Sequence, residues 1–152
     1  GVGLRDALLK INANEYPFGL VVILAGTNDL GLAFQMNQGV AGSAAAVSDS
    51  VIELLKIAHE EGVPTLAISI PESGFQHKVP DAKAIAIKAN EAIEKWCMDN
   101  CDKSSYVEFP FGWSIDDSRW SSDGLHLSEE GYFELAKGIA PIVYMNGRSF
   151  VH

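Results

Sequence analysis

The chain has 152 residues, a length that suits a single domain over residues 1–152. Hydrophobic residues make up 47% and charged residues 20%, a composition typical of a folded globular protein and not of a disordered one. Twenty acidic residues against eleven basic ones give a formal charge of −9, which disfavours nucleic acid and anionic membranes as partners. No apolar run approaches the roughly 20 residues of a membrane-spanning helix, so we expect no integral membrane segment.

A short helix over residues 4–11 comes first, because Leu4, Ala7, Leu8 and Ile11 follow helical spacing. A continuous apolar run over 20–25 then predicts a strand buried on both faces, as in a parallel sheet. Similar runs over 65–70 and 105–109 predict two further strands, each followed directly by a proline. Three strands make a small sheet, so we expect the first of them to lack a partner on one side.

Amphipathic helices are predicted between and after these strands. Apolar residues at helical spacing indicate helices over 47–58 and 85–96. Another helix is predicted to begin near Ser128, with its core side formed by Tyr132, Leu135, Ala136 and Ile139. Strands that alternate with helices in this way predict an α/β layered domain with a mostly parallel sheet.

Polar residues follow each predicted strand, where ligands bind in folds of this class. Asn28 and Asp29 follow the first strand, residues 72–77 the second, and the loop over 109–126 the third. Because the carboxyl ends of parallel strands share one edge of a sheet, these groups are expected to gather there.

Asp123 and His126 stand three residues apart just before the last predicted helix. In a catalytic role, the Asp123 carboxylate would accept a hydrogen bond from one ring nitrogen of His126, and the other nitrogen would remain free to take a proton. The alternative is that Asp123-Gly124 forms a turn and that His126 merely precedes a helix.

The block Gly26-Thr27-Asn28-Asp29 ends the first predicted strand. Gly26 would allow a sharp turn, the Asn28 amide could donate to a developing oxyanion, and Asp29 could hold the loop through backbone N–H groups. An ordinary turn after a buried strand explains the same residues equally well.

An aromatic cluster precedes Asp123 and consists of Phe109, Phe111, Trp113 and Trp120. These rings could floor an acyl or sugar pocket, or they could pack the loop against the sheet. Cys97 and Cys101, the only cysteines, lie four residues apart and are either reduced thiols on one helical face or a local redox pair.

Taken together, the two polar blocks resemble those of the SGNH (GDSL-type) serine hydrolases over roughly residues 18–145. Gly26, Asn28 and Asp29 match the Gly-x-Asn-Asp block of that family, and Asp123 and His126 match its Asp-x-x-His block. The resemblance implies a flavodoxin-like three-layer α/β/α sandwich, here lacking its first strands. It also implies serine-dependent ester hydrolysis, with His126 as the base, Asp123 as its orienting group and Asn28 as an oxyanion donor.

The family's Gly-Asp-Ser nucleophile block has no counterpart here, and no serine precedes Ser43. We therefore expect the chain to lack its N-terminal portion, with a diverged non-catalytic binding module or a rearranged site as alternatives. A nucleotide-binding domain is disfavoured, because the first strand is followed by Gly-Thr-Asn-Asp-Leu-Gly and not by Gly-x-Gly-x-x-Gly. The resemblance implies a small-molecule, lipid or carbohydrate ester as substrate, and neither a metal nor an organic cofactor. Localisation, oligomeric state and acyl length stay open.

Overall fold

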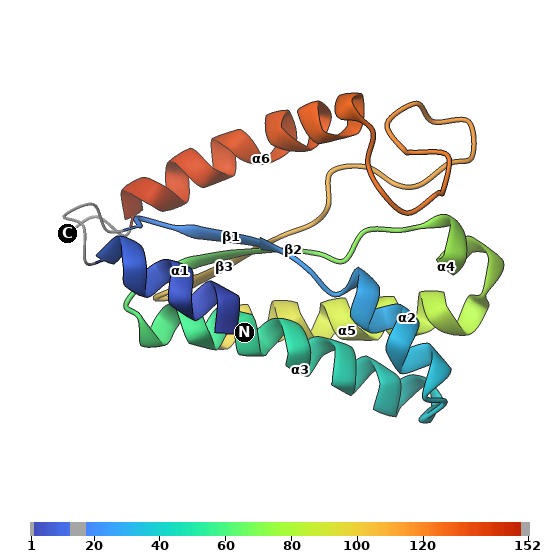
Figure 1. The fold of residues 1–152 in the computed structure, drawn as a ribbon, viewed down its shortest axis with the longest axis horizontal. Coiled ribbons are helices and arrows are strands. Elements are labelled where there is room, and N and C mark those ends of the chain that lie inside the picture. Colours follow the sequence, from blue (N-terminus) through green and yellow to red (C-terminus); the bar gives the residue numbers. More distant parts are fainter. Residues whose placement is uncertain (1, 13–17, 150–152) are drawn as a thin grey trace.

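The computed structural model describes residues 2–12 and 18–149 of the chain, and Figure 1 shows their arrangement. Helices and strands alternate along the sequence, as predicted. In chain order the elements are α1 (Val2–Asn12), β1 (Val21–Leu24), α2 (Thr27–Gln35), α3 (Gly39–Glu60), β2 (Thr65–Ile68), α4 (Gly74–Lys78), α5 (Pro80–Asp99), β3 (Ser104–Val107) and α6 (Glu129–Ser149).

The three strands form one parallel sheet in the order β1-β2-β3. In its register, Leu24 of β1 lies beside Ile68 of β2, which lies beside Val107 of β3. The central strand β2 is buried along its whole length, which explains its unbroken apolar sequence. β1 is an edge strand, and among the described residues its outer edge has no strand partner, as expected from the small number of strands.

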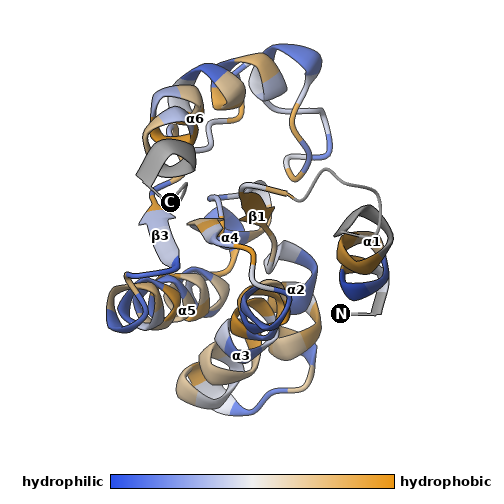
Figure 2. Ribbon diagram, turned by 90° about the vertical axis from the view of Figure 1, so that its left-hand side faces the viewer, coloured by the Kyte–Doolittle hydropathy of each residue, from blue (hydrophilic) through white to orange (hydrophobic). Residues whose placement is uncertain are grey.

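Helices cover both faces of the sheet, so the domain has three layers (Figure 2). Helices α2, α3 and α5 lie on one side, and α6 lies on the other (Figures 1 and 2). The main core lies between the sheet and the first helical layer, where Val47, Leu55, Ala89 and Ile93 have no exposed surface. This arrangement confirms the predicted α/β fold with its parallel sheet.

Two helices were not predicted, and part of the core-facing side of a third helix was predicted wrongly. α2 begins inside the Gly26–Asp29 block that we expected to be a turn, and α4 lies in the loop expected after β2. On α6 the prediction was wrong in part, because Leu135 is 93% buried as expected while Tyr132 and Ala136 are exposed. Tyr132 instead borders the pocket described below, so its ring lies at that pocket and not in the core.

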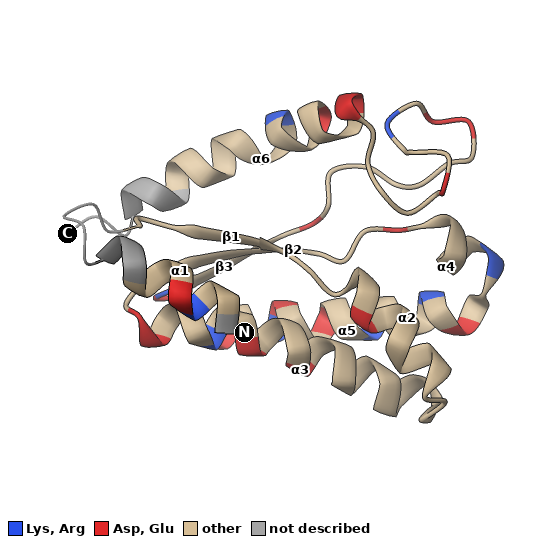
Figure 3. Ribbon diagram, in the orientation of Figure 1, with Lys and Arg blue, Asp and Glu red and all other residues tan. Residues whose placement is uncertain are grey.

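The surface charge of the fold reflects the acidic composition of the sequence. Acidic side chains outnumber basic ones and are spread over the outer helices and the loops beyond the sheet (Figure 3). Cys97 is buried and Cys101 is exposed, and both are free thiols. None of the helices in the described part of the chain is long and apolar enough to cross a membrane.

Candidate active site

The Asp123–His126 pair has the geometry expected of a base and its orienting group. The His126 Nδ1 atom lies 2.7 Å from the Asp123 Oδ2 atom. The other carboxylate oxygen, Oδ1, accepts hydrogen bonds from the backbone N–H groups of Leu125 at 2.9 Å and His126 at 3.0 Å. With the carboxylate ionised, Nδ1 must carry a hydrogen in order to donate to it, so in the neutral ring Nε2 is the nitrogen left as a proton acceptor.

These hydrogen bonds also set the ionisation of the carboxyl group. The bond from the His126 ring, followed by the backbone N–H groups of His126 and Leu125, lowers the pKa of Asp123 to about 2. The carboxylate is therefore ionised throughout the neutral range. Because the side chains of His126 and Asp123 are 68% and 50% exposed, solvent screens their mutual attraction, and the pair acts chiefly by fixing the ring.

The loop that carries the pair is anchored at both ends. Trp120 and Leu127 form an isolated antiparallel bridge across it, and the Ser121 N–H donates to the His126 carbonyl at 2.8 Å. Further along, the Gly124 carbonyl accepts from the Gly74 N–H at 2.8 Å, which joins the loop to the start of α4. The position of His126 is thus fixed by backbone contacts on two sides.

α6 begins directly after this loop and is capped by Ser128. The Ser128 Oγ atom accepts from the Gly131 N–H at 3.1 Å and donates to the Ser118 carbonyl at 2.6 Å. A side chain at Gly131 would collide with the carbonyl oxygen of Arg119, so the loop and the helix can pack this closely only around a glycine.

Asn28 reaches the site through a sharp backbone turn. Gly26 has a φ of 106° at the start of α2, a conformation that residues with a side chain rarely adopt. This turn places Asn28 in the first helical turn, where it is exposed beyond the end of β1. An amide at this place can donate to an oxyanion that forms in front of it.

One pocket of about 190 Å³ contains both Asn28 and His126. Residues almost a hundred positions apart therefore meet beyond the carboxyl ends of β1 and β3, where the topology predicted them to meet. Apart from the two polar residues, the lining is mostly apolar and comprises Leu24, Thr27, Pro71, Phe109, Trp120, Leu125, Leu127 and Tyr132.

The aromatic cluster divides between pocket and packing. Phe109 and Trp120 line the pocket, whereas Phe111 stacks edge-on against both of them from outside and carries the Arg119 guanidinium over its ring at 4.2 Å. Trp113 does not line this pocket and packs against His77, with the ring centroids 4.9 Å apart.

Asp29 takes no part in the pocket. It borders a separate hollow between the start of α2 and α3, and within the described residues it forms none of the backbone hydrogen bonds that we expected to hold the loop.

The pocket residues that sequence reasoning missed are Thr27, Pro71, Leu125, Leu127, Leu24 and Tyr132. Most of them adjoin the two polar blocks, so proximity in sequence was a usable signal. Tyr132 was assigned to the core because its helical spacing is the same for a ring that faces a pocket and for one that faces the sheet.

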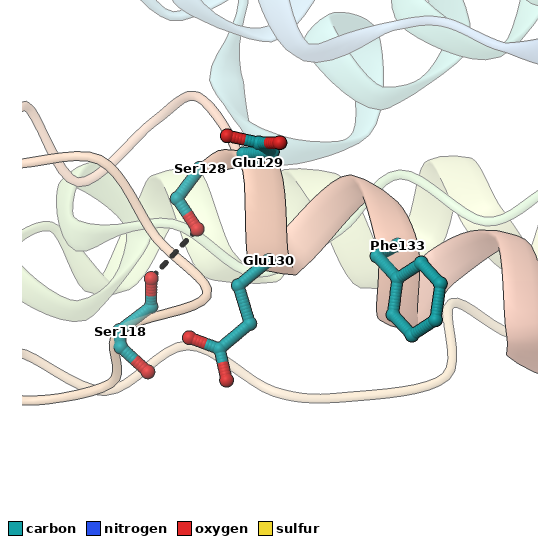
Figure 4. A pocket seen from close by; sticks show the side chains of 5 residues that line it. All are labelled: Ser118, Ser128, Glu129, Glu130 and Phe133. Carbon is teal, nitrogen blue, oxygen red and sulfur yellow. Dashed lines mark hydrogen bonds between the residues drawn. The ribbon is translucent and has the colours of Figure 1, made fainter.

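A second hollow of about 600 Å³ lies at the start of α6 (Figure 4). It is bordered by Ser118, Ser128, Glu129, Glu130 and Phe133, and it includes none of Asn28, Asp123 and His126. Glu129 and Glu130 occupy the first turn of α6, where negative charge stabilises a helix, so their presence is explained without a ligand.

The described residues place no hydroxyl or thiol in hydrogen-bond contact with the free side of the His126 ring. Ser43 is buried in α3 and donates to the Ala33 carbonyl at 3.0 Å, so it is not directed at the pocket. The described residues also contain no group of three or more side chains suited to hold a metal ion.

Comparison with known proteins places the chain in a family. The model for GDSL-like lipases and acylhydrolases matches residues 4–139. The chain belongs to this family. Among curated proteins there is no match.

Two solved structures share the fold. One is a GDSL-like lipase from Bacteroides thetaiotaomicron, with 20% identity and a TM-score of 0.66, and the match covers 95% of this chain and 68% of that protein. The other is a proposed acylhydrolase from Bacteroides fragilis, with 18% identity and a TM-score of 0.67, covering 96% and 68%. Family membership supports a general ester hydrolase function, and at these identities the two structures support the fold alone.

Proposed function

We propose that this protein hydrolyses acyl or O-acetyl esters through a serine acyl-enzyme, with His126 as general base, Asp123 as its orienting group and Asn28 as an oxyanion donor. The observation that carries the proposal is the single pocket that holds His126 and Asn28, with the His126 ring fixed by Asp123. A base and a hydrogen-bond donor are then directed at one space large enough for an ester group.

In the proposed reaction, a serine hydroxyl attacks the ester carbonyl and its proton passes to His126 Nε2. The carbonyl oxygen takes the negative charge and accepts a hydrogen bond from the Asn28 amide. When the tetrahedral intermediate collapses, the ester C–O bond breaks and the alcohol leaves with the proton from His126. Water then attacks the acyl-enzyme by the same route, which releases the acid and restores the serine.

We infer that the serine lies outside residues 1–152. Supporting this, no described hydroxyl hydrogen-bonds to His126 Nε2, and about a third of each structural relative has no counterpart in this chain. The wide exposure of the His126 ring fits a site that a further segment would cover. The alternative is a binding module that keeps the fold and has lost the serine.

The first test uses residues 1–152 alone with p-nitrophenyl acetate. We expect this polypeptide to hydrolyse the ester no faster than its Asp123→Ala variant, because the dyad has no hydroxyl to activate. A clear difference between the two would show that a nucleophile is present after all.

The second test uses the product of the complete gene. Asp123→Asn should reduce kcat by roughly 10²–10⁴-fold, since the asparagine amide would favour the wrong ring tautomer. Asp116→Asn is the matched control, because Asp116 is an exposed acid of the same loop, and its rate should stay unchanged. Asn28→Ala should cost roughly 10²–10³-fold. A complete protein that hydrolyses no ester would support the binding-module alternative.

A further inference from the structure

An apolar groove of about 570 Å³ opens beside the pocket, between α2 and α4. The Phe34 ring of α2 meets the Phe75 ring of α4 edge-on, with centroids 5.5 Å apart. Leu32 stands at the groove with 61% of its surface exposed, and Phe75 is 38% exposed. Large apolar side chains left in water around a groove mark a surface that a ligand can cover.

The groove is continuous with the candidate active site. Thr27, Asn28 and Leu125 border both spaces, whereas His126 borders only the smaller pocket. Asn28 therefore stands at the boundary between the two. A ligand whose carbonyl lies at Asn28 can extend into the groove without passing the imidazole.

This asymmetry decides which part of an ester enters the groove. The leaving alcohol must receive its proton from His126, so it lies on the His126 side. The carbonyl oxygen lies at the Asn28 amide. The remaining substituent of the carbonyl carbon, the acyl chain, is then directed away from the imidazole and towards Leu32 and Phe75.

The groove also has the right charge for such a chain. The protein carries a net charge of −9, yet none of the described residues that border the groove is charged. An uncharged hydrocarbon chain loses no ion pairing there and gains free energy from each methylene removed from water.

We propose that the groove between α2 and α4 is the acyl-chain site of this hydrolase, and that the substrate carries a medium-length acyl chain such as octanoyl in place of acetyl. The assignment of the acyl side rests on the proposed function, and it deepens that proposal by naming the acyl group. Leu32, Phe34 and Phe75 are its chain-binding residues.

The test measures binding directly, so that it needs no nucleophile. Residues 1–152 are titrated with butanamide and with octanamide, two uncharged probes that differ by four methylenes, while amide chemical shifts are followed by NMR. We expect octanamide to bind at least about tenfold more tightly and to shift the signals of Gly31, Leu32 and Phe75. Leu32→Asn should remove most of this preference.

Met98→Asn is the matched control, because Met98 is 64% exposed near the end of α5 and does not border the groove. It should bind both amides as the parent does. Equal binding of the two amides, or shifts confined to residues away from α2 and α4, would overturn the acyl-chain site. So would an octanamide preference that Leu32→Asn leaves intact.

An ester series on the product of the complete gene separates this inference from the proposed function. If p-nitrophenyl octanoate has a kcat/KM at least about tenfold above that of the acetate, and Leu32→Asn reverses the order, both proposals are supported. Hydrolysis that is fastest with acetate and indifferent to Leu32→Asn would refute the acyl-chain site and leave the hydrolase standing. Octanamide binding without hydrolysis of any ester would refute the hydrolase and retain the groove as an apolar binding site.

Discussion

Gly26→Ala should be among the more destabilising single-methyl changes in this protein. Gly26 has a φ of 106°, where an L-residue is strained by roughly 1–2 kcal/mol. A Cβ built there would also lie 2.7 Å from Ile70 Cδ1, 2.8 Å from Ile70 Cγ1 and 3.2 Å from Val51 Cγ2. Both neighbours are buried, so overpacking adds roughly 1–3 kcal/mol.

Gly39→Ala is the control that separates backbone strain from packing. Gly39 also has a positive φ, of 72°, yet nothing lies within 4 Å of a Cβ placed there. Gly39→Ala should lower the free energy of unfolding only by the cost of the backbone strain, roughly 1–2 kcal/mol, whereas Gly26→Ala should lower it by roughly 2–5 kcal/mol.

Urea unfolding followed by circular dichroism measures both variants, provided that the slope m is unchanged. Because the strain at residue 26 moves the first turn of α2, the amide signals of Asn28 should shift in Gly26→Ala alone. If the two variants were equally stable, the close approach of Ile70 would have no energetic weight, and the packing argument for Gly26 would fail.

Two further predictions concern groups away from the pocket. Burial lowers the pKa of His59 below its usual 6.5, so the unfolded chain binds a proton at this imidazole more tightly than the folded protein does. The free energy of unfolding should therefore be highest above pH 6.5, with respect to this group, and should decline as the pH falls from 6.5 towards the lower pKa of the folded state. His59→Gln should flatten this part of a urea-derived pH profile, and an unchanged slope would contradict the assignment. Asn90→Ala should cost about 1–3 kcal/mol, because the Asn90 side chain accepts from the Ile70 N–H at 2.8 Å and donates to the Ile70 carbonyl at 3.1 Å just beyond β2. Asn100→Ala, which removes only one bond to a helix carbonyl, should cost less in the same unfolding assay.

The features that sequence reasoning anticipated depend on local patterns. β2 was predicted because a strand buried on both faces is apolar along its length, and the sequence around Thr65–Ile68 is such a run. The contact between Asp123 and His126 was one of two interpretations of the sequence, and it was available from the local pattern because a span of three residues lets the carboxylate reach the ring.

The features that sequence reasoning missed depend on tertiary contacts with other parts of the fold. α2 begins at Thr27 without a side-chain cap, and the Gly, Asn and Asp residues at its start are as common in turns as at helix ends. Its helical conformation becomes evident only from Leu30 and Ala33, which pack into the core beside α3. Likewise nothing in the sequence of α6 distinguishes Tyr132, which faces the pocket, from Leu135, which is buried.

The two halves of the candidate site differ in how much of the fold each needs. The orientation of the His126 ring is set within four residues by Asp123, so it depends mainly on the local loop. The meeting of His126 with Asn28 depends on the parallel pairing of β1, β2 and β3, because that pairing brings the ends of the first and third strands to one edge. Among the described strands β1 and β3 each pair on one side only, and β1 is the less covered of the two, because Val22 and Leu24 remain exposed whereas no residue of β3 does. A segment that covered this strand would therefore stabilise the placement of the Asn28 amide, and would act on catalysis without touching the imidazole.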